Sequence, residues 1–258
     1  GALAGCDAVF HLAAHRAIAR SIDDPAGTDR TNSQGTVTVL QGAVDAGVGR
    51  VLYASSSSVY GDAAATPVRE CAPAVPVSPY AVSKLAGEHY CRVFGELYGI
   101  ETIALRYFNV YGPGQPSDGR YATVIPLFLE ALLAGRRPVV YGDGSLARDF
   151  TYVDDVVGAT VAAAAAPAAS PGRVYNVGAG TPCSLNGLLE MLGRLVGVVP
   201  DPVYEDARPG DVARTHADST AAARDLGFEQ SVRLEEGLGR TVDWFRARRA
   251  DAPAYVRI

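Results

Sequence analysis

Short apolar runs without alternating polar positions recur along the chain and indicate buried strands. Such runs are typical of a parallel sheet that is covered on both faces. We expect four strands of this kind, at residues 7–14, 50–54, 102–108 and 174–178. Between the first three, residues 32–47 and 79–98 carry apolar side chains at helical spacing, and Gly47 and Gly99 suit the helix ends. This order of strands and helices predicts a doubly wound α/β fold.

After Gly112 the predicted elements become short and mixed. We expect strands at 138–141 and 148–153 with a loop at 109–114 before them, and helices at 123–134, 154–165, 184–196, 218–226 and 234–248. Asp154, Ser184 and Asp218 are the expected N-caps of three of these helices. The pattern predicts one domain from residues 1–112 plus 151–180, and a smaller α/β domain from residues 113–150 plus 181–258.

Hydroxyl groups and a Tyr–Lys pair follow the second predicted strand. Residues 55–58 are four serines, at the carboxyl end of a strand, where open α/β sheets place ligands. Ser78 and Pro79 suit the start of a helix on which Tyr80 and Lys84 share one face. A nearby ammonium favours the phenolate, so this tyrosine could act as a base near neutral pH. Most isolated pairs of this type only line a solvated helix face.

Composition and charge narrow the classes of protein that fit. The net charge of −5 argues against a nucleic-acid partner. The four cysteines are scattered without metal-ligand spacing, so we expect reduced thiols, a cytoplasmic location and no metal site. The Ala-rich run at 161–169 is interrupted by Pro167 and is too weakly apolar for a membrane span, and no secretory signal is visible at the start.

Six stretches, in order, make the chain resemble one family. They are His11-Leu12-Ala13-Ala14, Ser55 to Gly61, Ser78 to Lys84, Leu105 to Gly112, Arg148 to Asp155, and Arg208-Pro209-Gly210-Asp211. The chain resembles the extended short-chain dehydrogenase/reductase family, in its sugar-nucleotide epimerase/dehydratase branch. The resemblance implies a Rossmann-like domain that binds NAD, a UDP-sugar substrate, and a homodimer formed by the helices at 32–46 and 79–98.

One feature of that family is missing from the sequence. Such enzymes open with a Gly-rich turn that holds the NAD pyrophosphate at a helix N-terminus, and no such turn stands here. Two strand–helix units, roughly 60 residues, are expected upstream of Gly1. The strand around Val9 to Leu12 should therefore be an exposed edge of the sheet.

The resemblance also assigns roles around the cofactor. Tyr80 would take the proton of a sugar hydroxyl, Lys84 would bond the nicotinamide ribose and lower the Tyr80 pKa, and Ser56 would bond the reacting hydroxyl. The cofactor-binding residues would be Ala13, Ala14, Arg16, Asn32, Ser55, Tyr80, Lys84, Tyr107 and Phe108.

A second set of residues would hold the UDP-sugar. Asn109, Arg148 and Arg208 would bind the diphosphate, since guanidinium groups suit phosphate oxygens. Asp211 would accept from the ribose, and Tyr141 would stack by the uracil. Ser56, Ser57, Ser58 and Thr215 would line the sugar pocket. An ordinary surface ion pair is the alternative interpretation of Arg148-Asp149.

The residues before Val59 indicate which reaction to expect. The related 4,6-dehydratases and decarboxylases carry a carboxylate there, whereas this chain has Ser57 and Ser58. We therefore predict 4-epimerisation through a transient 4-keto sugar, on UDP-Glc/UDP-Gal and, because Thr215 is small, also on UDP-GlcNAc/UDP-GalNAc. A UDP-glucuronate 4-epimerase or another C4-oxidising enzyme is the alternative. A non-catalytic NAD-binding scaffold is a third interpretation, which the joint presence of Ser56, Tyr80 and Lys84 disfavours.

Overall fold

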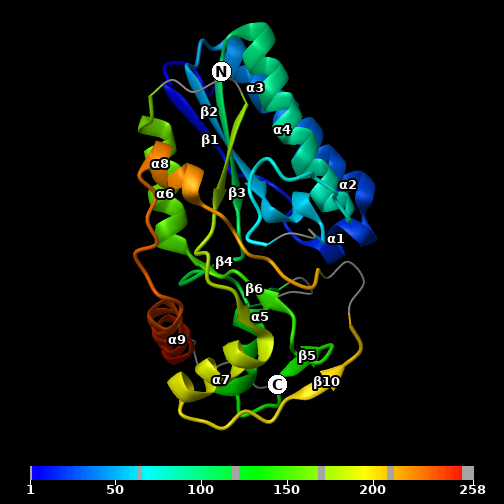
Figure 1. Cartoon of the computed structure of the whole chain (residues 1–258), viewed down its shortest axis with the longest axis vertical. Coiled ribbons are helices and arrows are strands. Elements are labelled where there is room, and N and C mark those ends of the chain that lie inside the picture. The colour runs from blue at the N-terminus through cyan, green and yellow to red at the C-terminus, as the bar shows by residue number, and fades with distance from the viewer. Residues whose placement is uncertain (1, 63–65, 118–121, 168–171, 208–211, 252–258) are drawn as a thin grey trace.

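A parallel four-stranded sheet forms the upper half of the molecule in the computed structural model (Figure 1). The structure describes residues 2–62, 66–117, 122–167, 172–207 and 212–251. The sheet has the order β1 (Ala8–His11), β2 (Arg50–Ser56), β3 (Glu101–Tyr107) and β8 (Arg173–Val177), and all three pairings are parallel. The four predicted strands of the main sheet are thus confirmed.

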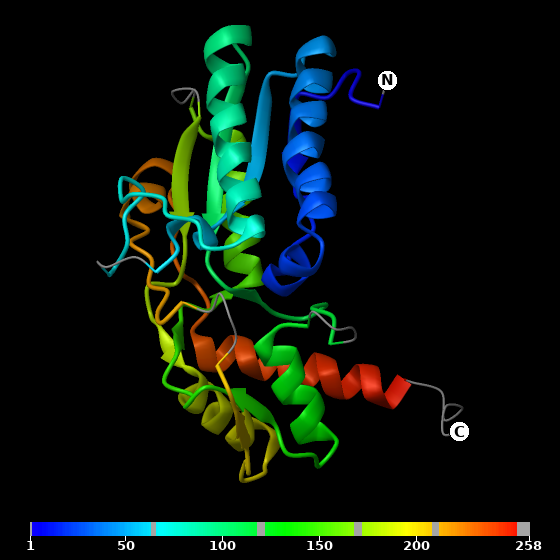
Figure 2. The same cartoon turned by 90° about the vertical axis from the view of Figure 1, so that its right-hand side faces the viewer.

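Helices cover both faces of this sheet. One face carries α1 (Ile18–Asp23), α2 (Pro25–Asp29), the π-helical turn η1 (Arg30–Gln34), α3 (Gly35–Asp45) and α4 (Pro79–Tyr98). Figure 2 shows α3 and α4 side by side. The other face carries α6 (Val153–Ala165) and α8 (Thr220–Leu226). Because side chains alternate along a strand, Val51 and Tyr53 pack with α3 and α4 while Leu52 packs with α6.

Helix α4 lies unusually close to β2, and its ends follow from local sequence. The Ser78 hydroxyl accepts from the Ala81 N–H at 3.2 Å, Pro79 occupies the first turn, and Gly99 closes the helix with a φ of 71°. A Cβ at Gly87 would lie 2.2 Å from the Tyr53 hydroxyl, so only glycine permits this approach. The close packing brings the first turn of α4 to the carboxyl end of β2.

The lower half is built from short strands and three helices around a separate apolar core. Its helices are α5 (Val124–Leu133), α7 (Leu185–Val196) and α9 (Leu234–Asp251). Its strands pair as β5 (Val139–Tyr141) with β10 (Val203–Glu205), β4 (Val110–Tyr111) with β7 (Thr151–Tyr152), and β6 (Ala147–Arg148) with β9 (Cys183–Ser184). The division of the chain into two domains at the predicted boundaries stays a prediction.

Several predicted boundaries are wrong. The strand expected at 148–153 is split into β6 and β7, and α6 begins at Val153 with Tyr152 as its N-cap, so Asp154 lies in the first turn instead. The N-cap of α8 is Ser219, and the Asp218 carboxylate accepts from the Thr220 N–H at 3.0 Å. The loop expected at 109–114 contains β4, and β10 was not expected at all. These errors arise because two- and three-residue strands depend on distant partners, which periodicity does not report.

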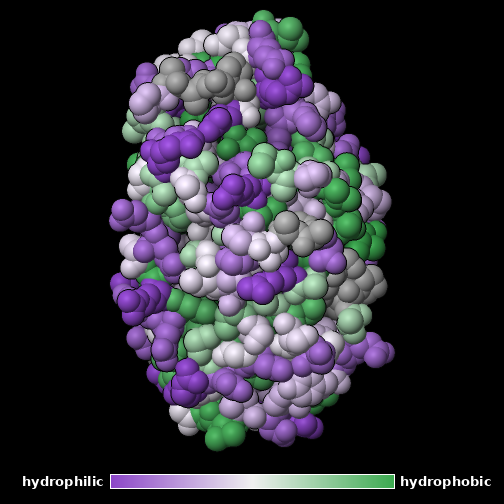
Figure 3. All heavy atoms as spheres, viewed as in Figure 1, coloured by the Kyte–Doolittle hydropathy of each residue, from purple (hydrophilic) through white to green (hydrophobic). Residues whose placement is uncertain are grey.

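Two surface predictions can be checked against the described residues. Among these residues, β1 pairs with β2 alone, and Phe10 and Leu12 are 46% and 58% exposed, which confirms an exposed sheet edge. No helix in the described ranges is both long and apolar enough to cross a membrane. Hydrophilic and hydrophobic residues are interleaved over the face seen in Figure 3.

Candidate active site

Tyr80, Ser56 and Lys84 meet where β2 ends and α4 begins. Ser56 is the last residue of β2, and its hydroxyl acts on the Tyr80 phenol, whose pKa it lowers. The Lys84 ammonium lies 6.0 Å from the centre of the Tyr80 ring and donates to the Ala54 carbonyl at 2.7 Å. Lys84 is 3% exposed, so its charge acts in a largely dry environment. The structure therefore brings together the three residues that the sequence predicted to be catalytic.

The pKa of the Tyr80 phenol is raised, which is the opposite of the predicted lowering. Burial is the main cause, and the Ser56 hydrogen bond and the charge of Arg16 oppose it. Burial also lowers the pKa of Lys84 to about 8. The residues of the chain thus hold the phenol protonated, and a further positive charge beside the ring is needed to reverse that balance.

A buried ion pair between Glu88 and Arg106 supports this arrangement. Glu88, two turns along α4 from Tyr80, accepts from Arg106 of β3 at 2.9 and 2.6 Å, and both side chains are almost fully buried. The Ser55 hydroxyl donates to Glu88, so its side chain points into this network. Sequence reasoning missed Glu88 and Arg106, although Glu88 follows Lys84 by four residues on the same helix face. The pair ties the end of β2, β3 and α4 together.

Asn32 holds the loop that follows β1. Its amide accepts from the His15 N–H at 2.8 Å and donates to the His15 carbonyl at 3.0 Å and to the Ser83 hydroxyl at 2.9 Å. The predicted cofactor residues Ala13, Ala14 and Arg16 lie in this loop, which Asn32 fixes against α4. The His15 Nδ1 atom is buried without a hydrogen-bond partner.

Tyr107 and Phe108 point to different parts of the fold. The Tyr107 hydroxyl is hydrogen-bonded to Thr160 of α6 at 2.8 Å, and Phe108 is buried with its ring 6.3 Å from that of Tyr60. Tyr60 belongs to the 3₁₀ turn η2 (Ser57–Tyr60), in which the Ser58 N–H and hydroxyl both donate to the Ser56 hydroxyl. Phe108 therefore packs against the turn η2, which contains Ser57 and Ser58.

Asn109, one of the predicted diphosphate ligands, lies in a chain of hydrogen bonds with Thr215 and Asp149. The Thr215 hydroxyl donates to the Asn109 amide oxygen at 2.9 Å and accepts from the Asp149 N–H at 2.9 Å. The Asp149 carboxylate is fully buried and accepts from the N–H groups of Gly180 and Ala217. The alternative of a surface Arg148–Asp149 ion pair is therefore wrong. Arg148 itself ends β6, next to this carboxylate.

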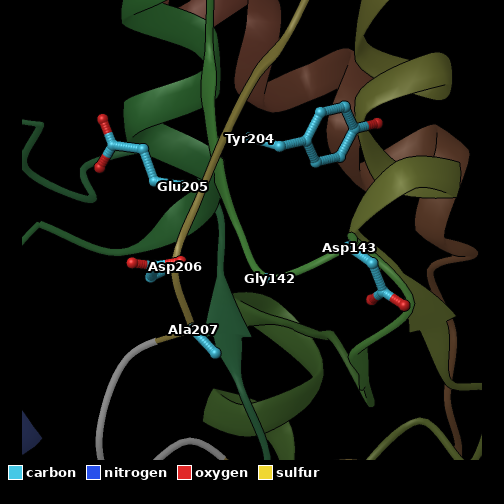
Figure 4. A pocket seen from close by; sticks show the side chains of 6 residues that line it. All are labelled: Gly142, Asp143, Tyr204, Glu205, Asp206 and Ala207. Atoms are coloured by element: carbon cyan, nitrogen blue, oxygen red, sulfur yellow. The ribbon is translucent and has the colours of Figure 1, made fainter.

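An open hollow of about 1020 Å³ lies where β5 and β10 end (Figure 4). Its walls are Gly142, Asp143, Tyr204, Glu205, Asp206 and Ala207, and the predicted base-stacking residue Tyr141 ends β5 beside it. The acidic side chains make this hollow unsuited to a diphosphate by itself. Arg208 and Asp211 lie outside the described residues. No group of His, Cys, Asp and Glu among the described residues could hold a metal ion.

Three comparisons with known proteins agree with this geometry. The UDP-glucose 4-epimerase of Mycolicibacterium smegmatis is 42% identical over 93% of this chain and 76% of its own. A UDP-N-acetylglucosamine 4-epimerase structure from Methanobrevibacter ruminantium superimposes with a TM-score of 0.91 at 35% identity, over 96% of this chain and 79% of that one. A structure of the UDP-glucuronic acid 4-epimerase of Bacillus cereus, in complex with UDP-glucuronic acid and NAD, superimposes with a TM-score of 0.88 at 32% identity. The match covers 94% of this chain and 76% of that one. Residues 2–178 match the NAD dependent epimerase/dehydratase family, and the chain belongs to that family.

Proposed function

We propose that this protein is a UDP-hexose 4-epimerase that acts through a transient 4-keto sugar. The observation that carries the proposal is the meeting of Ser56, Tyr80 and Lys84 at the carboxyl edge of the sheet. A proton acceptor, a hydroxyl that can orient the reacting oxygen, and a buried cation are the protein groups that assist the oxidation of a secondary alcohol by a hydride acceptor.

The chain's own residues handle the proton. Tyr80, as phenolate, takes the proton of the sugar C4 hydroxyl while Ser56 holds that hydroxyl by a hydrogen bond, and the reverse transfer completes the reaction. Because the Ser56 hydroxyl acts on the Tyr80 phenol, a substrate hydroxyl placed between them would meet both groups. The buried charge of Lys84 stabilises the phenolate.

The residues around Tyr80 fit a nicotinamide cofactor. The His15 Nδ1 atom is buried without a partner in the loop expected to face the cofactor, and the Lys84 ammonium has N–H groups beyond the one given to Ala54. Ala13, Ala14, Arg16 and Lys84 are the residues proposed to hold it, whereas Tyr107 and Phe108 are engaged with α6 and with the turn η2. When bound, NAD⁺ supplies the oxidising group and the positive charge that the raised pKa of Tyr80 requires.

Ser57 and Ser58 in the turn η2 favour epimerisation over elimination of water. Ser57 and Ser58 stand where the dehydratase branch carries carboxylates, and Ser58 is bonded back to Ser56. A hydroxyl is a poor acid or base near neutral pH, so neither serine can drive loss of the C6 hydroxyl.

The proposal extends to which UDP-sugars the protein accepts. We infer that both UDP-Glc/UDP-Gal and UDP-GlcNAc/UDP-GalNAc are accepted, because Thr215 is small. UDP-glucuronate is the second candidate, since the Bacillus cereus structure and a UDP-glucuronate 4-epimerase of Thermodesulfobacterium geofontis, 35% identical, are similar throughout.

We also propose a homodimer. Because Cys6, Cys71, Cys91 and Cys183 are all free thiols, we propose a cytoplasmic location as well.

One assay separates these outcomes. The protein is supplied with NAD⁺ and, in turn, UDP-Glc, UDP-GlcNAc and UDP-glucuronate, and the products are identified by NMR. Conversion of the first two to their C4 epimers is expected. Conversion of UDP-glucuronate alone would move the assignment to the second candidate, and NAD binding without any turnover would indicate a scaffold.

A further inference from the structure

Asn109 has a backbone conformation that residues other than glycine rarely adopt. Its φ is 25°, and it is the one such non-glycine residue in the described ranges. It joins β3 to β4, and its carbonyl accepts from the Thr151 N–H of β7 at 3.2 Å. Non-glycine residues held in such a conformation cluster at active sites and ligand-binding sites. The conformation therefore points to a role for the Asn109 amide.

The Thr215 hydroxyl determines which way that amide faces. The hydroxyl accepts from the Asp149 N–H, so its single proton is directed to the Asn109 Oδ1 atom, at 2.9 Å. With Oδ1 turned to Thr215, the Asn109 Nδ2 group faces the other way and keeps its two N–H donors. Asn109 and Thr215 are both half-buried, so this contact is partly shielded from water.

Thr215 is itself held firmly in place. Its N–H donates to the Ala147 carbonyl of β6 at 3.1 Å, and the Ala147 N–H donates to the Ala213 carbonyl at 3.1 Å. Two residues further on, the Ala217 N–H donates to the buried Asp149 carboxylate at 2.8 Å. The hydroxyl is thus fixed relative to β6, where Arg148 lies.

We propose that Thr215 is a positioning residue, which orients the Asn109 amide so that Nδ2 donates to a diphosphate oxygen of the nucleotide sugar. The proposal rests on the function proposed above and changes the expected role of Thr215. Its hydroxyl serves the diphosphate, which every UDP-sugar shares, in addition to any effect of its size on the sugar C2 substituent.

Two variants of Thr215 separate these roles. Thr215→Val keeps the volume and removes the hydroxyl, whereas Thr215→Ser keeps the hydroxyl and removes a methyl group. Affinities for UDP and for uridine are measured by calorimetry. The valine variant should bind UDP about tenfold more weakly, the size of one charge-assisted hydrogen bond, and uridine unchanged. The serine variant should bind both ligands as the wild type does.

Turnover adds a second readout. In Thr215→Val, KM should rise by the same factor for UDP-Glc and UDP-GlcNAc, with little change in kcat. Unchanged UDP affinity, or a loss confined to the N-acetylated sugar, would overturn the positioning role. Because binding of UDP is measured without turnover, a protein that epimerises no sugar would contradict the proposed function while leaving this test intact.

A variant of the partner residue covers the case in which Thr215→Val does not fold. Asn109→Asp keeps an acceptor for Thr215 but replaces the Nδ2 donor by a carboxylate oxygen. It should lower UDP affinity by more than tenfold, because like charges repel, and leave uridine affinity unchanged. Wild-type affinity of Asn109→Asp for UDP would contradict the proposed orientation.

Discussion

The Tyr80 phenol is the residue whose environment differs most from what its sequence neighbours indicated. The four-residue spacing from Lys84 correctly predicted a shared helix face, but the Lys84 ammonium lies 6.0 Å from the centre of the ring, and the side chain that lowers the pKa of the phenol is Ser56 of β2. Burial then raises the pKa of the phenol. Spacing along a helix reports proximity, whereas a pKa depends on solvation by residues from several elements.

The loss of the Tyr80 hydroxyl tests the proposed proton acceptor. Tyr80→Phe keeps the ring and removes the acceptor, so kcat should fall by at least ~100-fold, the usual size of a general acid–base contribution. Tyr90→Phe, on the exposed side of α4, is the matched control and should keep wild-type kcat. Steady-state kinetics measure both. Near wild-type epimerisation by Tyr80→Phe would contradict the role of Tyr80 as proton acceptor.

His11 makes stability depend on pH in a defined window. Its pKa is lowered from 6.5 to about 4, first by burial and then by the charge of Lys84. Between these values the unfolded chain binds the proton and the folded protein does not, so stability is lost as the pH falls. From pH 7 to pH 5 this group should remove about 2 kcal/mol of unfolding free energy.

The non-titrating variant His11→Asn isolates that contribution from the carboxylates that titrate in the same range. Urea unfolding of both proteins at pH 7 and pH 5 gives the four free energies needed. The variant should lose less stability than the wild type over this interval. Equal losses in the two proteins would show that His11 is readily protonated in the folded state.

At the level of elements, the position of α4 on the sheet decides where the site lies. Gly87 permits the close approach to β2, and the Glu88–Arg106 pair fixes α4 to β3. The identity and order of the long helices and strands could be predicted because their apolar periodicity is local. The Glu88–Arg106 pair and the Thr215–Asn109 bond could not, since they join segments 18 and 106 residues apart. The short strands β4, β9 and β10 escaped prediction for the same reason, and β6 and β7 were predicted as one strand.

The buried ion pair should be far more important to stability than an exposed one on the same helix. Arg106→Met leaves the Glu88 carboxylate buried without its partner, which should cost about 3–5 kcal/mol. Arg92→Met breaks the exposed Arg92–Glu96 pair and should cost at most about 0.5 kcal/mol. Denaturant unfolding of the two variants compares the costs. Equal costs would mean that Glu88 regains water or a new partner.

At the scale of the whole molecule, an apolar stripe runs along the outer side of α4. It comprises Val82, Tyr90, Val93 and Leu97, of which Leu97 is 71% exposed. Leu40, on the other helix that the resemblance assigned to the dimer, is fully buried, because it lies on the face of α3 that packs against β2 and α4. The outer stripe and the exposed edge of β1 are two apolar features of the described surface that the chain itself leaves uncovered.

The proposed dimer should depend on this stripe. Leu97→Lys places a charge at its most exposed position and should convert a dimer to a monomer at micromolar concentration, since an unpaired charge is costly in an apolar interface. Sedimentation velocity measures the two masses, and Leu127→Lys, at an exposed leucine of α5, serves as control. A wild-type protein that sediments only as a monomer would reject the dimer.

The central claim is that one site oxidises C4 and then reduces the opposite face of the same carbon. UDP-glucose carrying deuterium at C4 tests this claim most directly, when it is incubated with the protein and NAD⁺ and the product is analysed by NMR and mass spectrometry. The account predicts UDP-galactose that retains the deuterium at C4, because the hydrogen removed from the sugar returns to it within one turnover. UDP-galactose without the label, or a product that has lost water, would contradict it.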